Sequence, residues 1–148
     1  MFTVTKTYKD LPAAHRQPQH EGHCRLIHGH NWQFDITFTC DVLDKNGFVV
    51  DVGTLWEVKE FLVRTFDHTL LLNVDDSGIP QDSEAEAWVR RFATIVRVPN
   101  CGMEGLAQLV FDSADGIASK MKGAAERKLR VFEVVCWEDS KNRSTYRK

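Results

Sequence analysis

The chain has 148 residues, of which 43% are hydrophobic and 27% are charged, the balance of an ordinary globular domain. Nineteen basic and 21 acidic residues give a net charge of −2, which is too close to neutral for a nucleic-acid-binding surface. No apolar run approaches the roughly 20 residues of a membrane-spanning helix, and the first residues lack the apolar core of a secretion signal. These properties predict a cytoplasmic protein with one domain over residues 1–148 and no nucleic-acid or membrane partner.

Strand patterns dominate the first third of the chain. Residues 2–8 alternate polar side chains with apolar ones, which predicts a strand. Residues 11–29 contain two prolines and no sustained period, so we expect this segment to be largely irregular. Residues 31–43 carry an apolar side chain at every second position, which predicts a long strand with one buried face. The turn sequence at 44–47 predicts a hairpin, after which residues 48–50 pair back or lead into the next element.

Helical spacing becomes prominent after this hairpin. Apolar residues recur at helical intervals between residues 52 and 66, and Asp51 or Thr54 can cap the start of this helix. A second long helix is predicted over 103–121. The remaining predicted elements are a loop at 75–82, a short helix at 83–92, and strands at 93–98, 128–138 and 145–146. This order predicts an α+β fold with the helices on one face of an antiparallel sheet.

The stretch GHCRLIHGHNW, residues 22–32, concentrates metal-binding side chains. In an extended chain, residues two apart point to the same side, so His28 and His30 can approach one metal ion. A catalytic zinc site needs a third protein ligand. His15 is a candidate because strand pairing could bring it alongside, and His20 and His23 compete with it. The alternative interpretation is a solvated histidine loop without a metal.

Cysteine chemistry is concentrated at Cys24. A nearby dication favours the thiolate, so Cys24 is a candidate fourth ligand of a closed site or a base held just off the metal. A buried, unreactive thiol is the third possibility. Cys40 and Cys136 lie in apolar strand patterns and are expected to be buried, whereas Cys101 lies in a loop ahead of a helix.

Two further polar positions have a chemical and a structural interpretation. Asp67 can orient His68 for acid–base catalysis, but adjacent strand residues point to opposite sides, so their contact needs an irregular backbone or a partner chain. The structural alternative is a polar pair that ends a helix. Glu138 ends a very apolar strand, where its carboxylate could accept hydrogen bonds from the paired donors of a guanine-like ring. The structural alternative is a strand that simply reaches solvent.

Five motifs occur in order: AAHR (13–16), C-x3-HGHN (24–31), DH-x3-LN (67–73), P-N-x3-E (99–104) and WE (137–138). Together they resemble the 6-pyruvoyl-tetrahydropterin synthase and 6-carboxytetrahydropterin synthase family over residues 2–146. The resemblance implies the tunnelling fold (T-fold), an α+β architecture in which two main helices lie on one face of an antiparallel four-stranded sheet. It also implies a homohexamer built from two trimers, with active sites between chains.

The resemblance implies a role for each of the singled-out residues. His15, His28 and His30 match the three zinc ligands of the family, and Cys24 matches its catalytic thiol. Asp67 and His68 match the Asp–His pair that partners this thiol from another chain. Glu138 matches the glutamate that anchors the pterin ring, and Glu104 matches a glutamate of the loop before the second helix, near the pterin pocket. In this assignment His23 is a bystander.

The implied activity is that of a zinc-dependent lyase of queuosine biosynthesis. It converts 7,8-dihydroneopterin triphosphate to 6-carboxy-5,6,7,8-tetrahydropterin, acetaldehyde and triphosphate. Three residues separate Cys24 from His28, a spacing that resembles the bacterial carboxy-forming members. Alternatives are a pyruvoyl-type synthase that only eliminates triphosphate, another zinc lyase or aldolase that cleaves the pterin side chain, and a non-catalytic pterin-binding protein.

The chain departs from the family pattern in two places. Gly102 and Met103 stand where the family loop usually carries a Thr/Ser pair. The segment 72–98 is also longer than expected for the short bacterial members.

Overall fold

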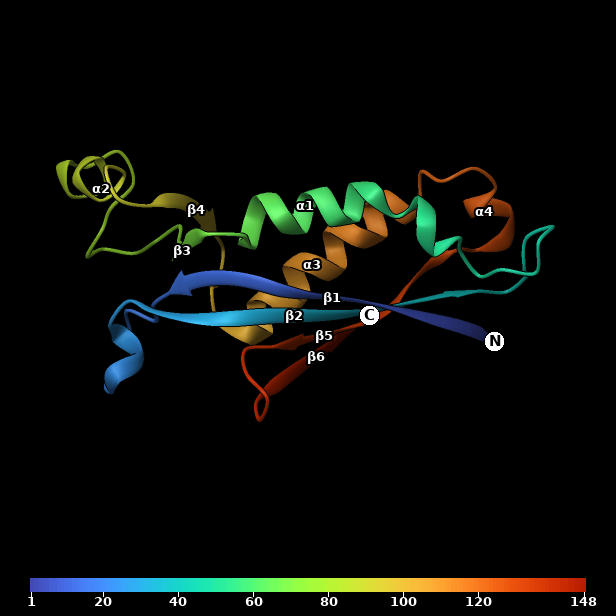
Figure 1. Ribbon diagram of the computed structural model, residues 1–148, viewed down its shortest axis with the longest axis horizontal. Coiled ribbons are helices and arrows are strands. Elements are labelled where there is room, and N and C mark those ends of the chain that lie inside the picture. The colour runs from blue at the N-terminus through green and yellow to red at the C-terminus, as the bar shows by residue number, and fades with distance from the viewer.

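The computed structural model describes residues 1–148. Its strands are β1 (Phe2–His15), β2 (His28–Cys40), β3 (Thr69–Asn73), β4 (Thr94–Val98), β5 (Arg130–Trp137) and β6 (Arg143–Arg147). Its helices are α1 (Trp56–Phe66), α2 (Glu84–Val89), α3 (Met103–Ala118) and α4 (Ala124–Arg127), with 3₁₀ turns η1 (His23–Arg25) and η2 (Val52–Thr54). Figure 1 shows the two longer helices, α1 and α3, above one curved sheet.

The sheet is mixed and has six strands in the order β4-β3-β1-β2-β5-β6. β1, β2, β5 and β6 pair antiparallel, whereas β3 pairs parallel with both β1 and β4. The α+β class with two main helices on one face is confirmed, but the expected four-stranded antiparallel sheet is wrong in strand number and direction. The sequence pattern missed β3, because a parallel strand buried on both faces is a continuous apolar run without alternation.

The ladder between β1 and β2 extends into the segment that was expected to be irregular. β1 continues to His15 and β2 begins at His28, so both ends of the segment 11–29 are paired strand. Pro12 is accommodated because its carbonyl remains available and accepts the N–H of His68 at 2.7 Å. Residues 48–50, by contrast, form no strand.

A one-residue bulge in β1 changes which side chains face the core. Tyr8 pairs with Phe34 and Leu11 pairs with Trp32, so β1 advances three residues while β2 advances two. Asp10 adopts the left-handed conformation, with φ of 61°, inside this bulge. Even-numbered positions such as Tyr8 pack on the core before the bulge, and odd-numbered positions from Leu11 onward face it afterwards.

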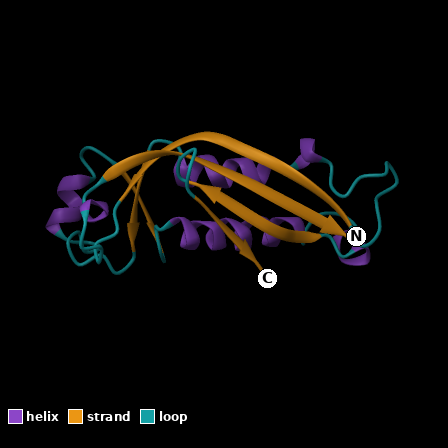
Figure 2. Cartoon of the chain, turned by 90° about the horizontal axis from the view of Figure 1, so that it is seen from below, coloured by secondary structure: helices purple, strands orange, loops and turns teal.

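α1 and α3 cover the same face of the sheet and pack against each other. Figure 2 shows them side by side behind the strands. α1 packs against β1 and β3, and α3 packs against β5 and β6. Asp51, one of the two expected caps, accepts the N–H of Gly53 at 2.9 Å at the start of the turn before α1. Asp115 ties α3 to β5 because its Oδ1 accepts the N–H of Val131 at 2.8 Å.

β2 supplies the centre of the hydrophobic core. Its alternate side chains from Trp32 to Cys40 are fully buried, as their period-two pattern predicts. Phe34 stacks on Phe66 of α1 with ring centroids 4.6 Å apart. The thiols of Cys40 and Cys136 are free and buried in this core, which confirms the expectation from their strand positions.

A second, smaller apolar cluster joins β3 and β4 to the loop ahead of α2. Its buried members are Leu70, Leu72, Ile79 and Ile95.

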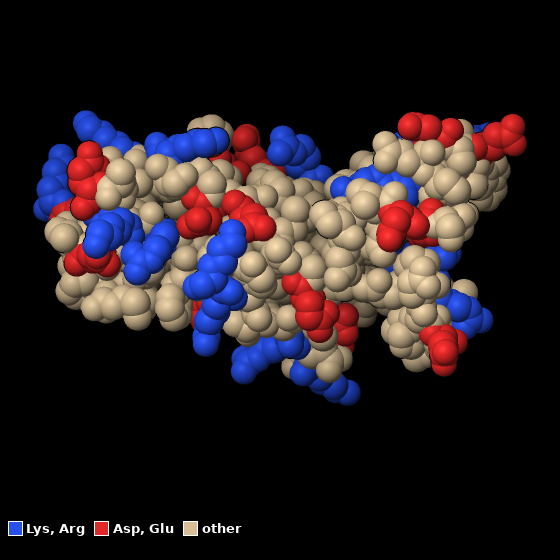
Figure 3. Space-filling view, turned by 180° about the vertical axis from the view of Figure 1, so that it is seen from behind, with Lys and Arg blue, Asp and Glu red and all other residues tan.

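None of the helices has the length and apolar character that crossing a bilayer requires. Acidic and basic side chains are interspersed on the face shown in Figure 3.

We predict that the Phe34–Phe66 contact carries a large part of the core stability. Phe34→Ala should lower the free energy of unfolding by about 3–5 kcal/mol, because it opens a cavity in a fully buried stack. Phe92→Ala is the matched control, since the Phe92 side chain is exposed, and should change it by about 0.5 kcal/mol. Urea unfolding monitored by circular dichroism measures both. Equal destabilisation of the two variants would contradict the position of the core.

Candidate metal centre and active site

Three imidazoles converge at one end of the β1–β2 ladder. His15 is the last residue of β1 and pairs with His28, the first residue of β2, while His30 pairs with Ala13. The bulge in β1 places His15 on the same face as the other two rings. The potential ligand atoms of the three histidines all lie within 4.8 Å of one another. His20 and His23, the competing candidates, do not belong to this group.

Hydrogen bonds define the tautomers of two of these rings. His15 Nδ1 lies 2.6 Å from the carbonyl oxygen of Cys101, and His28 Nδ1 lies 2.7 Å from that of Leu26. A carbonyl oxygen only accepts hydrogen bonds, so each Nδ1 carries the hydrogen. In the neutral form of each ring, Nε2 then carries a free lone pair. The two Nε2 atoms face each other 3.1 Å apart. Facing lone pairs repel unless a cation lies near both, so this geometry suits a bound metal ion.

The donor set fits zinc. A group of three imidazoles is the ligand set of an open, catalytic type of zinc site. Zn–N bonds of ~2.0–2.1 Å in a tetrahedron separate the ligand nitrogens by about 3.3 Å, close to the 3.1 Å between the Nε2 atoms of His15 and His28. The Nδ1–H donors to backbone carbonyls are the usual outer contacts that orient histidine ligands.

Burial keeps His15 in its neutral form. The residue is 3% exposed, and this desolvation is the main reason that its pKa is lowered to about 4. The hydrogen bond to Cys101 opposes the shift, and the positive charges that His28 and His30 can carry reinforce it. The ring is therefore uncharged at neutral pH, which is the form that binds a metal.

Trp32 forms a rigid surface beneath the histidines. The rings of His15 and His30 meet its indole edge-on, with centroids 5.0 and 5.2 Å away. Trp32 is fully buried, and its Nε1 donates to the carbonyl of Ala13 at 3.2 Å. Both imidazoles thus pack against a side chain that is itself held in place.

Two carboxylates lie at the same end of the sheet. Glu138 follows β5, and its Oε2 lies 3.8 Å from Nε2 of His30. Glu104 lies in the first turn of α3 rather than in the loop before it, where the helix dipole favours a negative charge. Burial raises the pKa of the Cys136 thiol well above its ordinary value, and Glu138 and Glu104 raise it further. Of the two carboxylates, Glu138 is the one in direct contact with a histidine of the group.

Cys24 lies on the loop that joins the two strands carrying the histidines. It belongs to η1, is partly exposed and has a free thiol. Its carbonyl accepts the N–H of Gln17 at 2.8 Å, which closes the loop. The thiol is not a member of the group of ligand atoms, so that group consists of imidazoles alone.

Asp67 and His68 contact each other but are not members of the group of three imidazoles. His68 Nδ1 is 2.5 Å from Asp67 Oδ1, and a φ of 57° at His68 is the irregular backbone that such a contact requires. The His68 side chain is 84% exposed. It lines a shallow depression of about 430 Å³ together with Ala14, Gly29 and His30. No hydrogen bond or ion pair joins this pair to the three imidazoles, and neither residue belongs to their group of ligand atoms.

The polar residues behind His15 were not recognised from the sequence. Cys101, expected only as a loop residue, is fully buried and supplies the carbonyl to which His15 donates. Burial raises the pKa of its thiol to about 11. Asn73, the last residue of the DH-x3-LN motif, accepts the N–H of Cys101 at 2.8 Å. The sequence offered Asn73 only as the end of a motif and of an apolar run, and neither signal indicates its contact with Cys101.

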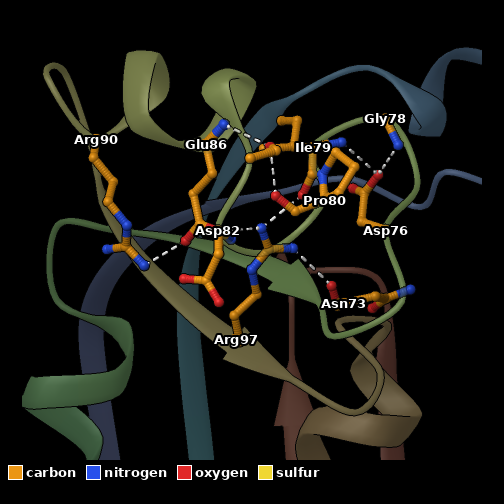
Figure 4. Close-up of polar contacts among 10 residues, drawn as sticks. Asn73, Asp76, Gly78, Ile79, Pro80, Asp82, Glu86, Arg90 and Arg97 are labelled. Atoms are coloured by element: carbon orange, nitrogen blue, oxygen red, sulfur yellow. Dashed lines mark hydrogen bonds and ion pairs between the residues drawn. The ribbon is translucent and has the colours of Figure 1, made fainter.

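A network of charged side chains lies beyond Asn73 (Figure 4). Glu86 of α2 is buried and contacts the guanidinium groups of Arg90 and Arg97 at 2.5 and 3.2 Å. Burial raises the pKa of Glu86, but a backbone N–H and the two arginines lower it more, so that it falls below its ordinary value. Arg97 also donates to the carbonyls of Asn73 and Ile79, at 3.0 and 2.6 Å. The long segment between β3 and β4 is thereby fastened to both strands.

Comparison with known families assigns the class of this protein. The model of the family described as 6-pyruvoyl tetrahydropterin synthase matches residues 3–148. The chain therefore belongs to this family, as the ordered motifs predict.

Individual relatives have carboxytetrahydropterin names. The chain is 36% identical over 76 residues to a 6-carboxy-5,6,7,8-tetrahydropterin synthase from Rickettsia typhi, a match covering 51% of this chain and 55% of that protein. It is 37% identical over 67 residues to the Bacillus subtilis enzyme of that name, covering 45% of this chain and 44% of the relative. The chain thus spans about half the length of these curated relatives.

Solved structures with low sequence identity share the fold. An uncharacterized protein from Wolinella succinogenes superimposes with a TM-score of 0.79 at 17% identity, covering 99% of this chain and 98% of that one. A 6-pyruvoyl tetrahydropterin synthase from Plasmodium falciparum gives 0.67 at 15% identity, with coverage of 99% and 98%. These likenesses confirm the predicted T-fold.

The lowered pKa of His15 predicts a pH-dependent stability of the metal-free protein. The unfolded chain binds a proton at His15 near pH 6.5 and the folded chain only near pH 4, so stability from the neutral ring is present above pH 6.5 and is lost as the pH falls toward 4. Between pH 7 and 4.5 the wild type should lose about 2 kcal/mol more than His15→Gln. Urea unfolding of both proteins in chelator measures the difference. Parallel pH profiles would show that His15 is not desolvated.

Proposed function

We propose that this protein is a zinc-dependent lyase that converts 7,8-dihydroneopterin triphosphate and water to 6-carboxy-5,6,7,8-tetrahydropterin, acetaldehyde and triphosphate. The observation that carries the proposal is the group of three imidazoles, in which two lone-pair nitrogens face each other at 3.1 Å and a carboxylate lies 3.8 Å from the third ring. The family membership and the names of relatives from Rickettsia and Bacillus support it.

His15, His28 and His30 are the residues that would hold the zinc ion. When bound, zinc supplies a Lewis acid that acidifies the carbon-bound proton beside the side-chain hydroxyls of the substrate. The chain contributes neutral imidazoles with defined tautomers, because the carbonyls of Cys101 and Leu26 take the Nδ1 hydrogens. These contacts and the packing on Trp32 orient the ligand nitrogens before a metal binds.

Glu138 would anchor the pterin ring. Its two oxygens can accept the ring N–H and the amino group of the pyrimidine edge, a planar pair of charge-assisted hydrogen bonds. Glu104, in the first turn of α3, would lie near the pterin pocket, as the family resemblance implies. A pterin held by Glu138 would therefore lie beside the three histidines, with its side chain within reach of them.

Cys24, Asp67 and His68 would handle the protons. As a thiolate, Cys24 removes the acidified proton, and His68, oriented by Asp67, shuttles protons during the rearrangement that follows. The His68 side chain is 84% exposed and has no hydrogen bond to the imidazoles of its own chain, so it would serve the site of a neighbouring chain. We therefore propose a homohexamer, a dimer of trimers, with shared sites.

The three-residue gap between Cys24 and His28 favours the carboxy product. The alternative product is the pyruvoyl compound, which forms by elimination of triphosphate without release of acetaldehyde. We also propose that residues 1–148 act as one domain in the cytoplasm, without a nucleic-acid or membrane partner.

Cys24→Ala should separate proton abstraction from metal binding. Turnover of dihydroneopterin triphosphate, measured as acetaldehyde release, should fall by about 10²–10⁴-fold because the base is lost. The zinc content should stay at the wild-type level, since the thiol is not part of the ligand group. Cys40→Ala, which removes a buried thiol on β2, is the matched control and should remain active.

The same assay tests the metal and the product. Removing zinc with a chelator should abolish acetaldehyde release, and added zinc should restore it. If Cys24→Ala lost its zinc, the thiol would be a ligand and its assignment as base would be wrong. If the pterin product had the mass of the pyruvoyl compound and no acetaldehyde were released, the protein would catalyse the pyruvoyl-type reaction and not the carboxy-forming one.

Glu138→Ala should weaken substrate binding through the pterin ring. Loss of a charge-assisted hydrogen bond of about 1.5–3 kcal/mol should raise KM roughly 10–100-fold while zinc content stays unchanged. Glu133→Ala on the same strand, which loses the ion pair to Arg147, is the control and should leave KM within about twofold. Steady-state kinetics with metal analysis distinguishes them. An unchanged KM in Glu138→Ala would remove this residue from the pterin site.

A further inference from the structure

Asn73 ends β3 and belongs to the DH-x3-LN motif, yet the proposed reaction gives it no task. Its side-chain oxygen makes two contacts with one residue. Asn73 Oδ1 accepts the backbone N–H of Cys101 at 2.8 Å and lies 2.8 Å from the Cys101 thiol. Cys101 is fully buried, so its N–H has no solvent to replace this acceptor.

Cys101 presents its other backbone group to the metal centre. Its carbonyl oxygen accepts the Nδ1–H of His15 at 2.6 Å. Its thiol also lies 3.3 Å from the carbonyl of Arg16, the residue after His15. One residue therefore stands between Asn73 on one side and His15 on the other, and its peptide groups face both.

Asn73 is itself held in place. Its backbone carbonyl accepts from Arg97 Nη1 at 3.0 Å, as Figure 4 shows, and Arg97 in turn contacts the buried carboxylate of Glu86 at 3.2 Å. Asn73 also pairs with Val98 in the β3–β4 ladder. The backbone of Asn73 is thus held by two neighbouring strands and does not lie in a free loop, so its side-chain oxygen projects from a fixed position.

We propose that Asn73 is a positioning residue for the zinc ligand His15, acting through the backbone of Cys101. By fixing the Cys101 N–H, Asn73 orients the carbonyl that takes the Nδ1 hydrogen of His15, and so directs the lone pair of Nε2 toward the metal. This inference rests on the proposed zinc site. It assigns the asparagine of the motif to metal affinity rather than to contact with the substrate.

The chemistry of the chain favours this role over simple structural support. Outer contacts to ligating histidines typically change metal affinity 10–100-fold when they are lost. The relevant group on Cys101 is its backbone, so the thiol should contribute less than Asn73 does. An aspartate at position 73 keeps an acceptor oxygen at the same distance from the chain and should replace the amide.

The test measures zinc affinity by competition with a chromophoric chelator, alongside the unfolding free energy of each metal-free protein. Asn73→Ala should bind zinc about 10–100-fold more weakly. The zinc affinity of Asn73→Asp should stay within about fivefold of the wild-type value. The same holds for Cys101→Ala, which keeps both peptide groups. Thr69→Val is the matched control, because it removes another buried hydrogen bond from β3, the one from its Oγ1 to Thr65 at 2.7 Å, without touching Cys101.

The outcomes separate the inference from the proposed reaction. Weaker zinc binding in Asn73→Ala but not in Thr69→Val supports the positioning role. Wild-type affinity in Asn73→Ala, or equal losses in both variants, overturns it. If Asn73→Ala does not fold, the other two variants decide. A loss of zinc affinity in Asn73→Asp or Cys101→Ala as large as the loss in His15→Ala overturns the positioning role. Retained zinc affinity in both variants supports it. A wild type that binds no zinc overturns the metal site and this inference together, whereas zinc binding without acetaldehyde release overturns the reaction alone.

Discussion

The group of three histidines depends on one extra residue in β1. Side chains along a strand alternate between its two faces, so a shift of one residue sends every later side chain to the other face. The bulge at Asp10 makes this shift between Tyr8 and Leu11. Without it, His15 would point away from His28 and His30, and β1 would present Pro12 and Ala14 to the core instead. The bulge therefore converts a continuous hairpin into a site with ligands from both of its strands.

The hydrophobic core and the histidine group are parts of one surface. The row of buried side chains on β2 that begins at Trp32 continues directly into His30 and His28. Burial desolvates His15 and lowers its pKa, while the carbonyl of Cys101 defines its tautomer. Packing, desolvation and hydrogen bonding thus favour the same state, a neutral ring with a fixed orientation. A metal ion bound there would meet ligands that need little reorganisation.

The parts of the structure that were predictable from the sequence are those with a local signal. The alternation in β2 and the helical period of α3 predict both elements, and the ordered motifs select the histidines that the structure brings together. β3 has no alternation, and the bulge has no glycine to mark it. The contact between Asn73 and Cys101 joins residues 28 apart in the chain, so no local pattern reports it. What escaped prediction was strand pairing and the long-range polar contacts that pairing creates.

The proposed sharing of sites between chains has a genetic consequence. In the proposed homohexamer, a site would take its three imidazoles from one chain and its Asp67–His68 pair from a neighbouring chain. A chain defective only in its histidine ligands and a chain defective only in His68 would each be inactive alone. Mixed assemblies of the two would contain some sites built entirely from intact halves. Such a pair of alleles would complement each other within a single gene.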